Sequence, residues 1–419
     1  MTREIVYDLS EVFEASTGKL RYYGIVRVVA EVGAHLLRLD PTIRFCIHSA
    51  AHDAFFEVFP TLDHDGSVAL NVPSGVRQKR LRSRFYKPNP LRDVLAALAR
   101  GVVMARNRRA WDEAGIELPR IDMSGKIYVH CGRPKLIVEA IGTLRRRASD
   151  VRIVPYVHDL IPLHDHVEGR RKDYPLNFMG DTGFALSDAA LVLANSEFTR
   201  RELIEFSAKG LLPSPPAVVA VPLVHECPEG AEPAEQAPPA APFLLAVGSA
   251  TGRKNLEVVF DAMLVLHERG AIVPGLCLAG APRKRTRDFY EQPRYAPIRD
   301  RIIEVANPNQ TDLVALYRAA LALVIPSRIE GWGLPAGEAL WLGTPAICSD
   351  VPVLHEVCGD LGLYFGPDAP DALADHVMLL LDNPQFAEQL RGRIRDARPQ
   401  LRDWFRVAGD MLAALKPLC

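Results

Sequence analysis

The sequence predicts an α/β protein built from two doubly wound domains, and three observations support this prediction. The chain has 419 residues, which is enough for two or three domains. Short apolar, β-branched segments alternate with amphipathic helical patterns along most of its length, as is typical of parallel sheets covered by helices on both faces. A stretch without periodicity, residues 225–242, divides that alternation into two halves.

The composition is that of an ordinary globular protein. Hydrophobic residues make up 48% and charged residues 24%, which excludes a disordered chain or a coiled coil. Seven cysteines without C-x-x-C spacing argue against a disulfide framework or a zinc ribbon and favour a reducing compartment. The charged N-terminus does not resemble a secretory signal, and no run of about 18 apolar residues predicts a spanning helix. We therefore expect a cytoplasmic protein.

The first half, residues 1–224, is predicted to form one domain. Apolar runs predict buried strands at residues 5–9, 43–47, 127–130, 153–157, 190–194 and 218–223. After an N-terminal loop, Ile25, Val28, Val29, Val32 and Leu36 recur at the spacing of one helix face. Residues 225–242, HECPEGAEPAEQAPPAAP, are rich in Pro, Ala and Glu and indicate an interdomain linker, with a long loop inside one domain as the alternative.

The second domain is predicted to cover residues 243–400. Strands are expected at residues 243–247, 275–279, 301–305, 321–325 and 346–349. Helices are expected from a cap at Asn255 towards Gly270, over residues 311–320 and over residues 335–342. Residues 401–415 form a further amphipathic pattern. Two such domains are expected to bind ligands in a cleft at the carboxyl ends of their strands.

The most informative segment is residues 325–350, IPSRIEGWGLPAGEALWLGTPAICSD. Gly331 and Gly333 let the backbone approach a ligand closely, and Pro335 suits the first turn of a helix. The amide groups at such a helix start attract an anionic phosphate. Glu330 in the loop and Glu338 in the helix can accept hydrogen bonds from sugar hydroxyls. The alternative for Glu338 is a first-turn acid favoured by the helix dipole.

A pair of cations follows the first strand of the second domain, in the turn GSATGRKN. Arg253 and Lys254 together can neutralise a diphosphate, because Arg offers a planar fork of donors and Lys a point charge. The alternative is a solvated surface pair. Gly248 and Gly252 do not form G-x-G-x-x-G, which argues against a nicotinamide site.

The segment VHDLIPL supplies candidate residues in the first domain. His158 and Asp159 come directly after the strand predicted at residues 153–157 and are therefore expected to face the cleft. The alternative is a histidine satisfied at a strand end.

Two other loops carry weaker signals. Gly24 and Arg27 lie in STGKLRYYGIVR, where a helix begins, and Arg27 can reach a diphosphate or an anionic acceptor unless it is an ordinary surface arginine. Asn195 or Ser196, after the strand at residues 190–194, is expected to cap the next helix.

The segment 76–120 is strongly basic, with twelve Lys and Arg against four Asp and Glu. Its net charge of +8 leaves −9 on the rest of a chain whose total is −1. Apolar residues interleave with the arginines, a pattern that fits a helix lying on anionic lipid. The alternative is a cationic insertion that packs on the first domain. Nucleic-acid binding is not expected, because no RNA- or DNA-binding module accompanies the segment.

EGWGLPAGEALWLGTP resembles the E-x7-E signature of the family 4 retaining glycosyltransferases, which have the GT-B fold. The resemblance extends from FLLAVGSATGRKNLE to VPVLHEVCGDLGLYF in the second half and is weaker in the first, where VHDLIPL and GIVR resemble the H-D-L-x-P and T-G-I-x-R stretches of this family. Tyr23 replaces the small residue usual before the glycine. The closing LRDWFRVAGDMLAALK resembles a helix that, in GT-B enzymes, crosses back to the first domain, so residues 401–419 are expected to pack there through Trp404, with a free C-terminal helix as the alternative.

The resemblance implies a role for each candidate residue. Glu338 would hold the ribose of a nucleotide sugar and Glu330 the hydroxyls of its sugar, while Arg253 and Lys254 would stabilise the leaving diphosphate. His158 would support the developing charge. The remaining donor-site residues would be Gly248, Gly331, Trp332, Gly333 and Leu334. The remaining residues of the acceptor side would be Gly24, Arg27 and Asp159.

The implied activity is retaining transfer of a hexose, with GDP-mannose preferred as donor, to a hydroxyl of a glycan or lipid-linked glycan in the synthesis of surface polysaccharide or glycolipid. The leaving diphosphate would help to deprotonate the acceptor, so no metal ion or cofactor is expected. His164, Asp165 and His166 imitate metal ligands, but this family stabilises the diphosphate with cationic side chains. A nucleotide-sugar epimerase and a catalytically silent nucleotide-sugar-binding scaffold remain alternatives, as does peripheral contact with the inner membrane face.

Overall fold

The structure is a computed structural model. It describes residues 3–16, 24–64, 66–73, 76, 86, 89–148, 150–167, 174–230, 233–240, 242–248 and 252–419. The chain divides into two compact units, which we call unit 1 (Met1–Pro222 with Trp404–Cys419) and unit 2 (Leu223–Asp403). The final residues thus belong to the same unit as the N-terminal half.

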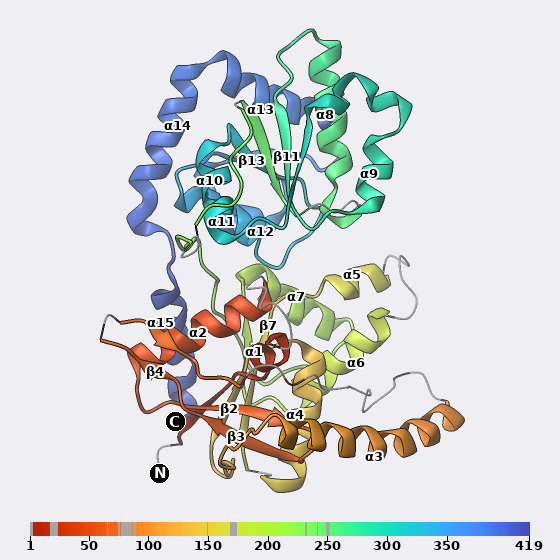
Figure 1. Ribbon diagram of the computed structural model, residues 1–419, viewed down its shortest axis with the longest axis vertical. Helices are drawn as coiled ribbons and strands as arrows, with labels where there is room; N and C mark the ends of the chain where they lie inside the picture. Colours follow the sequence, from red (N-terminus) through yellow and green to blue (C-terminus); the bar gives the residue numbers. More distant parts are fainter. Residues whose placement is uncertain are drawn as a thin grey trace. The chain divides into compact units, whose positions relative to one another are not determined.

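Unit 1 is built on a seven-stranded sheet in the order β3-β2-β1-β6-β7-β8-β9 (Figure 1). All neighbouring strands are parallel except β3, which pairs antiparallel with β2 at the edge. The strands of this sheet are β1 (Ile5–Asp8), β2 (Arg44–Ser49), β3 (Ala54–Val58), β6 (Ile127–His130), β7 (Arg152–Val157), β8 (Val192–Ala194) and β9 (Val218–Ala220). A separate two-stranded ribbon joins β4 (Thr61–Leu62) to β5 (Val68–Ala69).

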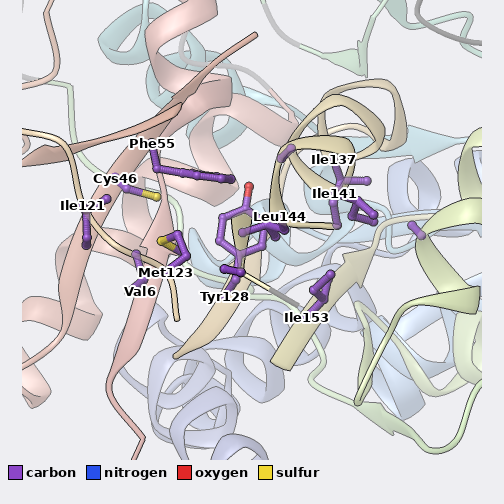
Figure 2. Packing of buried hydrophobic residues seen from close by; sticks show 13 residues of the cluster. Val6, Cys46, Phe55, Ile121, Met123, Tyr128, Ile137, Ile141, Leu144 and Ile153 are labelled. Atoms are coloured by element: carbon purple, nitrogen blue, oxygen red, sulfur yellow. The ribbon is translucent and has the colours of Figure 1, made fainter. Parts of the chain in front are cut away.

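Helices alternate with the strands of unit 1, and their apolar faces supply its core, except in α3 (Pro90–Glu113), whose large apolar side chains are mostly exposed. They are α1 (Ser10–Ala15), α2 (Ile25–Leu39), α3 (Pro90–Glu113), α4 (Pro134–Arg147), α5 (Ile161–Val167), α6 (Tyr174–Ser187), α7 (Glu197–Ala208) and α15 (Trp404–Leu415). Figure 2 shows the part of this core in which Tyr128 lies among apolar side chains from β1, β2, β3, β7 and α4. The rings of Tyr128 and Phe55 meet edge to face, with centroids 5.4 Å apart.

Unit 2 contains a six-stranded, wholly parallel sheet in the order β12-β11-β10-β13-β14-β15 (Figure 1). Its strands are β10 (Phe243–Val247), β11 (Gly275–Gly280), β12 (Ile302–Ala306), β13 (Ala322–Ile325), β14 (Ala346–Ser349) and β15 (Gly362–Phe365). This is the order of a Rossmann-type doubly wound sheet, in which the chain reverses its direction of progress between β10 and β13. The carboxyl ends of these two strands therefore mark the expected ligand site.

The helices of unit 2 follow the same alternation. They are α8 (Leu256–Glu268), α9 (Lys284–Tyr290), α10 (Gln310–Ala319), α11 (Leu334–Trp341), α12 (Pro352–Cys358), α13 (Pro370–Asp382) and α14 (Pro384–Ala397). Short 3-10 helices lie at η1 (Gly252–Lys254), η2 (Pro293–Arg301), η3 (Gly359–Leu361), η4 (Arg398–Gln400) and, in unit 1, η5 (Lys416–Leu418). No helix within the described residues combines the length and hydrophobicity needed to cross a membrane.

The strands predicted from apolar runs are confirmed, with ends that differ by up to three residues. The predicted cap at Asn255 is wrong in its chemistry. Asn255 has a left-handed backbone (φ 52°) and makes no side-chain cap; its amide donates instead to the carbonyl of Pro367 at 2.7 Å. Segment 225–242, predicted to be a linker, lies within unit 2, where the backbone amides of Glu235 and Gln236 donate to Asp312 at 2.7 and 2.9 Å.

Candidate active site

The candidate donor site of unit 2 lies in the loops that follow β10 and β13. The chain leaves β10 at Gly248 and enters η1, which contains Arg253 and Lys254. The loop after β13 contains Glu330 and leads into α11. Because β10 and β13 are neighbouring parallel strands, both loops emerge at the same edge of the sheet.

Arg253, Lys254 and Glu330 form one ionic cluster. Lys254 Nζ donates to one carboxylate oxygen of Glu330 at 2.5 Å, and Arg253 Nη1 donates to the other at 3.2 Å. Arg253 also donates to the carbonyl of Ile329 at 2.9 Å. Glu330 is only 8% exposed, and burial alone would raise its pKa, but Lys254 and Arg253 hold the pKa below its usual value. The sequence placed these three residues in two separate motifs, and the fold brings them together.

The loop and the start of α11 are shaped by glycine and proline. Gly333 has a left-handed backbone (φ 95°), and a Cβ there would lie 2.8 Å from Leu354 Cδ2. Leu334 opens the helix, with Pro335 in its first turn. Gly331 is buried just before the turn. A side chain at position 333 would therefore meet both backbone strain and a steric contact.

Glu338 lies further along α11 and is 4% exposed. One of its carboxylate oxygens accepts a hydrogen bond from the Tyr317 hydroxyl of α10 at 2.8 Å. This contact anchors the carboxylate to a neighbouring helix, so Glu338 is more than a solvated first-turn acid. Tyr317 is a partner that the sequence motif did not indicate.

Trp332 and Gly248, two of the candidate donor-site residues of unit 2, differ in their surroundings. Trp332 is buried, and its indole N–H donates to the carbonyl of Val224 at 2.9 Å, while its ring packs edge to face against His225. Trp332 therefore fixes the segment that enters unit 2. Gly248 has a φ of 88°, and a Cβ at this position would meet no atom within 4 Å, so the backbone is open on that side.

In unit 1, His158 and Asp159 follow β7 and line a pocket of about 400 Å³. His158 Nε2 donates to the carbonyl of Cys131 at 2.6 Å, which leaves Nδ1 as the acceptor nitrogen of the ring. Burial lowers the pKa of His158 and favours the neutral ring. Asp159 accepts from the backbone amide of Ile161 at 3.1 Å and so helps to begin α5.

Gly24 and Arg27 begin α2 but do not line this pocket. Gly24 has a φ of 60° and is exposed. Arg27 is buried, with its guanidinium 5.8 Å from the ring centroid of Trp404 in α15, so it is not a surface arginine. Tyr23 and residues 17–22, which the sequence analysis also considered, lie outside the described residues. As expected, Ser196 caps α7 by accepting from the amide of Thr199 at 2.9 Å.

Sequence reasoning missed a polar network at the carboxyl ends of β1 and β6. His130 Nδ1 lies 2.6 Å from Asp8 Oδ2, and both residues are buried. Asp8 also accepts from the Tyr128 hydroxyl and from the backbone amide of Ser10. Asp8 ends β1 and His130 ends β6, and both strands were predicted from the sequence. The sequence did not indicate that β1 and β6 are neighbours in the sheet, which is what brings the two side chains together.

No group of three or more His, Cys, Asp or Glu side chains in the described part of the chain is arranged to hold a metal ion. His164, one of the residues considered in that role, pairs instead with Glu202 of α7.

Sequence comparison relates the second half of the chain to known transferases. Residues 231–397 match the family described as "Glycosyl transferases group 1". The O-antigen chain mannosyltransferase B of Escherichia coli is 30% identical over 214 residues, which are 49% of this chain and 55% of that protein. The O-antigen chain mannosyltransferase RfbU of Salmonella typhimurium is 42% identical over 119 residues, 28% of this chain and 33% of that one. The chain thus spans about half the length of the first relative and a third of the second.

Solved structures resemble the whole chain. Sucrose-phosphate synthase from Thermosynechococcus elongatus has a TM-score of 0.65 at 17% identity and covers 100% of this chain and 99% of its own. Anabaena Alr3699/HepE, solved in complex with UDP and glucose, has a TM-score of 0.62 at 13% identity, with coverage of 99% and 100%. At such identities the likeness concerns the fold alone. Together with the two doubly wound sheets, these matches identify a chain of GT-B fold whose residues 231–397 match the family "Glycosyl transferases group 1".

Proposed function

We propose that this protein is a retaining glycosyltransferase that moves a hexose from a nucleotide diphosphate sugar to a hydroxyl of a glycan or lipid-linked glycan. The observation that carries the proposal is the cluster of Arg253, Lys254 and Glu330 at the strand reversal of unit 2, inside the segment that matches the transferase family. GDP-mannose is the donor we propose, and the names of the two O-antigen chain mannosyltransferases support mannose as the transferred sugar and a surface polysaccharide as the product.

In this proposal the two cations bind the diphosphate of the donor. Side chains of Arg253 and Lys254 are about one-third exposed, so a ligand can reach them. Both now share the carboxylate of Glu330, and a diphosphate that takes over their charge would release Glu330 to accept hydrogen bonds from sugar hydroxyls. Glu338 would hold the ribose, and the amides of Gly333 and Leu334 at the start of α11 would face the phosphates.

The reaction forms a bond between the acceptor oxygen and the anomeric carbon as the bond from that carbon to the diphosphate breaks. The electron pair leaves with the diphosphate, and a diphosphate oxygen takes the proton of the acceptor hydroxyl on the same face of the sugar. Arg253 and Lys254 stabilise the charge that develops on the leaving group, so the step needs neither a metal ion nor a cofactor. His158, with a neutral ring, would supply an electron-rich group beside the developing positive charge.

We further propose that α3 rests on the inner face of the membrane and keeps a cytoplasmic enzyme near a lipid-linked acceptor. Large apolar side chains are exposed along one stripe of this helix, at Leu91, Val94, Leu95, Leu98 and Val102. Arg106 and Arg109 continue the same stripe, and both are exposed. An apolar stripe that ends in cations is the pattern of a helix lying on anionic lipid. The residues at 77–85 that make the segment strongly basic lie outside those described.

The test is the thermal shift of the purified protein with GDP, UDP and dTDP, since a ligand that binds only the folded state raises the melting temperature. We expect one nucleotide to stabilise the wild type and to lose most of this effect in the double variant Arg253→Ala, Lys254→Ala. The matched control is Lys284→Ala with Arg285→Ala, a Lys-Arg pair exposed on α9. No shift with any nucleotide in folded protein, or equal shifts in both variants, would refute the donor site. If the protein, incubated with the nucleotide sugar alone, releases the 2-epimer of the donor sugar, the epimerase alternative is favoured.

A further inference from the structure

The carboxylate of Glu338 is held by Tyr317, a side chain that lies outside both sequence motifs of the candidate donor site. Tyr317 belongs to α10, and its hydroxyl donates to Glu338 Oε2 in α11 at 2.8 Å. Tyr317 is fully buried, and Glu338 is 4% exposed. A buried carboxylate requires hydrogen-bond donors, and its two oxygens together can accept about four hydrogen bonds. Tyr317 supplies one of these donors from a neighbouring helix.

Tyr317 is itself fixed at a second point. The fully buried Thr344, which follows α11, donates from Oγ1 to the Tyr317 carbonyl at 2.7 Å. The Thr344 amide also donates to the carbonyl of Ala339 in α11 at 2.8 Å. Tyr317 thus contacts α11 through its hydroxyl and the end of that helix through its carbonyl. Because both contacts hold α10 against α11, the hydroxyl has little freedom to move relative to Glu338.

The helix that carries Glu338 is held in place as well. Gly337 packs so closely on the segment that enters unit 2 that a Cβ there would lie 2.9 Å from His225 Cα and 3.0 Å from the Val224 carbonyl oxygen. The indole of Trp332 donates to the same carbonyl at 2.9 Å. A closely packed helix and a fixed hydroxyl together give the Glu338 carboxylate one preferred orientation.

A carboxylate with a fixed orientation can distinguish a vicinal diol from a single hydroxyl. The 2′- and 3′-hydroxyls of a ribose can both donate to one carboxylate, whereas a 2′-deoxyribose offers only one of these donors. In a buried site the missing donor leaves a charged acceptor incompletely satisfied, and hydrogen bonds to charged groups contribute more than those between neutral groups. Such a site therefore rejects the deoxy sugar as long as the carboxylate keeps its orientation.

We propose that Tyr317 is a positioning residue that makes the donor site selective for ribonucleotides. It acts through Glu338 and does not touch the donor. The donor class is then a ribonucleoside diphosphate sugar, such as a GDP or UDP sugar, and dTDP sugars are rejected. This inference rests on the proposed function, in which Glu338 holds the ribose, and adds to it the requirement for the 2′-hydroxyl and the residue that sets it.

The experiment compares the affinities of GDP and 2′-deoxy-GDP for the full-length protein by isothermal titration calorimetry, with UDP and 2′-deoxy-UDP as a second pair. We expect the wild type to bind the ribonucleotide of one pair about tenfold to hundredfold more tightly than its deoxy analogue. Tyr317→Phe should weaken binding of the ribonucleotide, leave binding of the deoxy form nearly unchanged, and so reduce this ratio by about threefold or more. A purely structural contact would affect both forms equally.

The matched control is Tyr290→Phe, which removes another tyrosine–glutamate hydrogen bond of unit 2. The Tyr290 hydroxyl donates to Glu304 of β12 at 2.9 Å, and neither residue belongs to the candidate donor site. Both variants should melt at a lower temperature than the wild type, but Tyr290→Phe should keep the wild-type ratio of affinities. Thr344→Val, which removes the second contact of Tyr317, takes the place of Tyr317→Phe if that variant does not fold.

The ratio of affinities decides the inference. Equal binding of the ribo and deoxy forms by the wild type overturns it, and so does the same ratio in Tyr317→Phe as in Tyr290→Phe. If Arg253→Ala with Lys254→Ala abolishes nucleotide binding while the wild type binds both forms equally, the donor site stands and only the ribose selectivity fails. If the folded wild type binds none of the four nucleotides, the proposed function is refuted together with this inference.

Discussion

Glu330 remains ionised in a buried position because two cations contact it, and its stability contribution depends on pH in a defined direction. Its pKa is lowered in the folded state, so the contribution is present above the unfolded pKa and is lost as the pH falls through the folded pKa. In Lys254→Ala, burial remains while the closest cation is gone, which raises the pKa. We therefore expect the variant to lose stability at a higher pH than the wild type, and to be about 1–3 kcal/mol less stable near neutral pH.

Thermal unfolding followed from about pH 3 to pH 7 tests this expectation. Lys284→Ala is the control, since its ion pair with Asp288 lies on the surface and such pairs contribute little. Parallel pH profiles for Lys254→Ala and the wild type would contradict a structural link between Lys254 and the Glu330 charge.

Position 333 requires glycine for two reasons: its backbone is left-handed, and Leu354 leaves no room for a Cβ. We expect Gly333→Ala to destabilise the protein by about 1–3 kcal/mol, because alanine would take a left-handed conformation and its Cβ would contact Leu354. Gly101→Ala in the exposed middle of α3 should instead stabilise by about 0.5–1 kcal/mol, since nothing lies within 4 Å of the new Cβ and alanine favours a helix. Chemical denaturation of both variants gives the comparison, and similar changes would show that the turn at 333 relaxes freely.

Some site residues could be predicted at this scale and others could not. Arg253, Lys254 and Glu330 each follow a strand whose apolar run is plain in the sequence, so their position at one edge of a parallel sheet was readable. The side-chain partners of the site residues could not be predicted, because they come from distant segments of the chain. Arg27, for example, lies against the ring of Trp404, and Trp332 donates to the carbonyl of Val224. Asp8 and His130 were missed for the same reason, since the order of the strands decides that they touch.

At the scale of the element, apolar runs with helical patterns between them predicted the parallel strands of both sheets except β15, the edge strand of unit 2 that pairs with β14. The edge strand β3 was not predicted. Its sequence AFFEV is short and pairs antiparallel, so no crossover helix separates it from β2. Asn255 is a second case that the sequence did not predict. Asparagine favours helix caps, but here its side chain donates to the carbonyl of Pro367 instead of capping α8.

Helix α3 is the element whose exposed surface needs an explanation beyond the fold. If it lies on lipid, Leu95→Glu with Leu98→Glu should reduce sedimentation with phosphatidylglycerol vesicles by about tenfold or more, since each buried leucine contributes about 1.5–3 kcal/mol. Ile204→Glu on α7, an exposed apolar residue outside the stripe, is the control and should bind as the wild type does. Equal binding of all three proteins, or equal binding to phosphatidylcholine vesicles, would refute the lipid contact.

At the scale of the whole molecule, the alternating pattern predicted two doubly wound sheets, but composition did not locate the boundary. The Pro- and Ala-rich stretch belongs to unit 2, because backbone amides of Glu235 and Gln236 donate to Asp312, which also takes part in the capping box of α10 in that unit. Such a contact is invisible in the sequence, where the stretch has no periodicity.

At the same scale, Trp404 belongs to unit 1 together with residues 1–222, from which the whole of unit 2 separates it in the sequence. It is buried at the start of α15, a helix that packs on α2. We expect Trp404→Ala to cost about 3–5 kcal/mol and to increase amide exchange in α2. Phe405→Ala, which removes an exposed ring, should change neither quantity. Hydrogen exchange read by mass spectrometry tests this, and loss of protection confined to residues 404–415 would mean that α2 does not depend on the terminal helix.

Both ends of the chain lie in unit 1, so unit 2 is topologically an insertion between Pro222 and Trp404. A mechanical load applied to the two ends enters unit 1 from both sides, and unit 2 carries no tension while unit 1 stays folded. In an optical trap that grips the termini, unit 1 must therefore rupture before unit 2 bears force. A bound nucleotide would then strengthen only the second of the two ruptures.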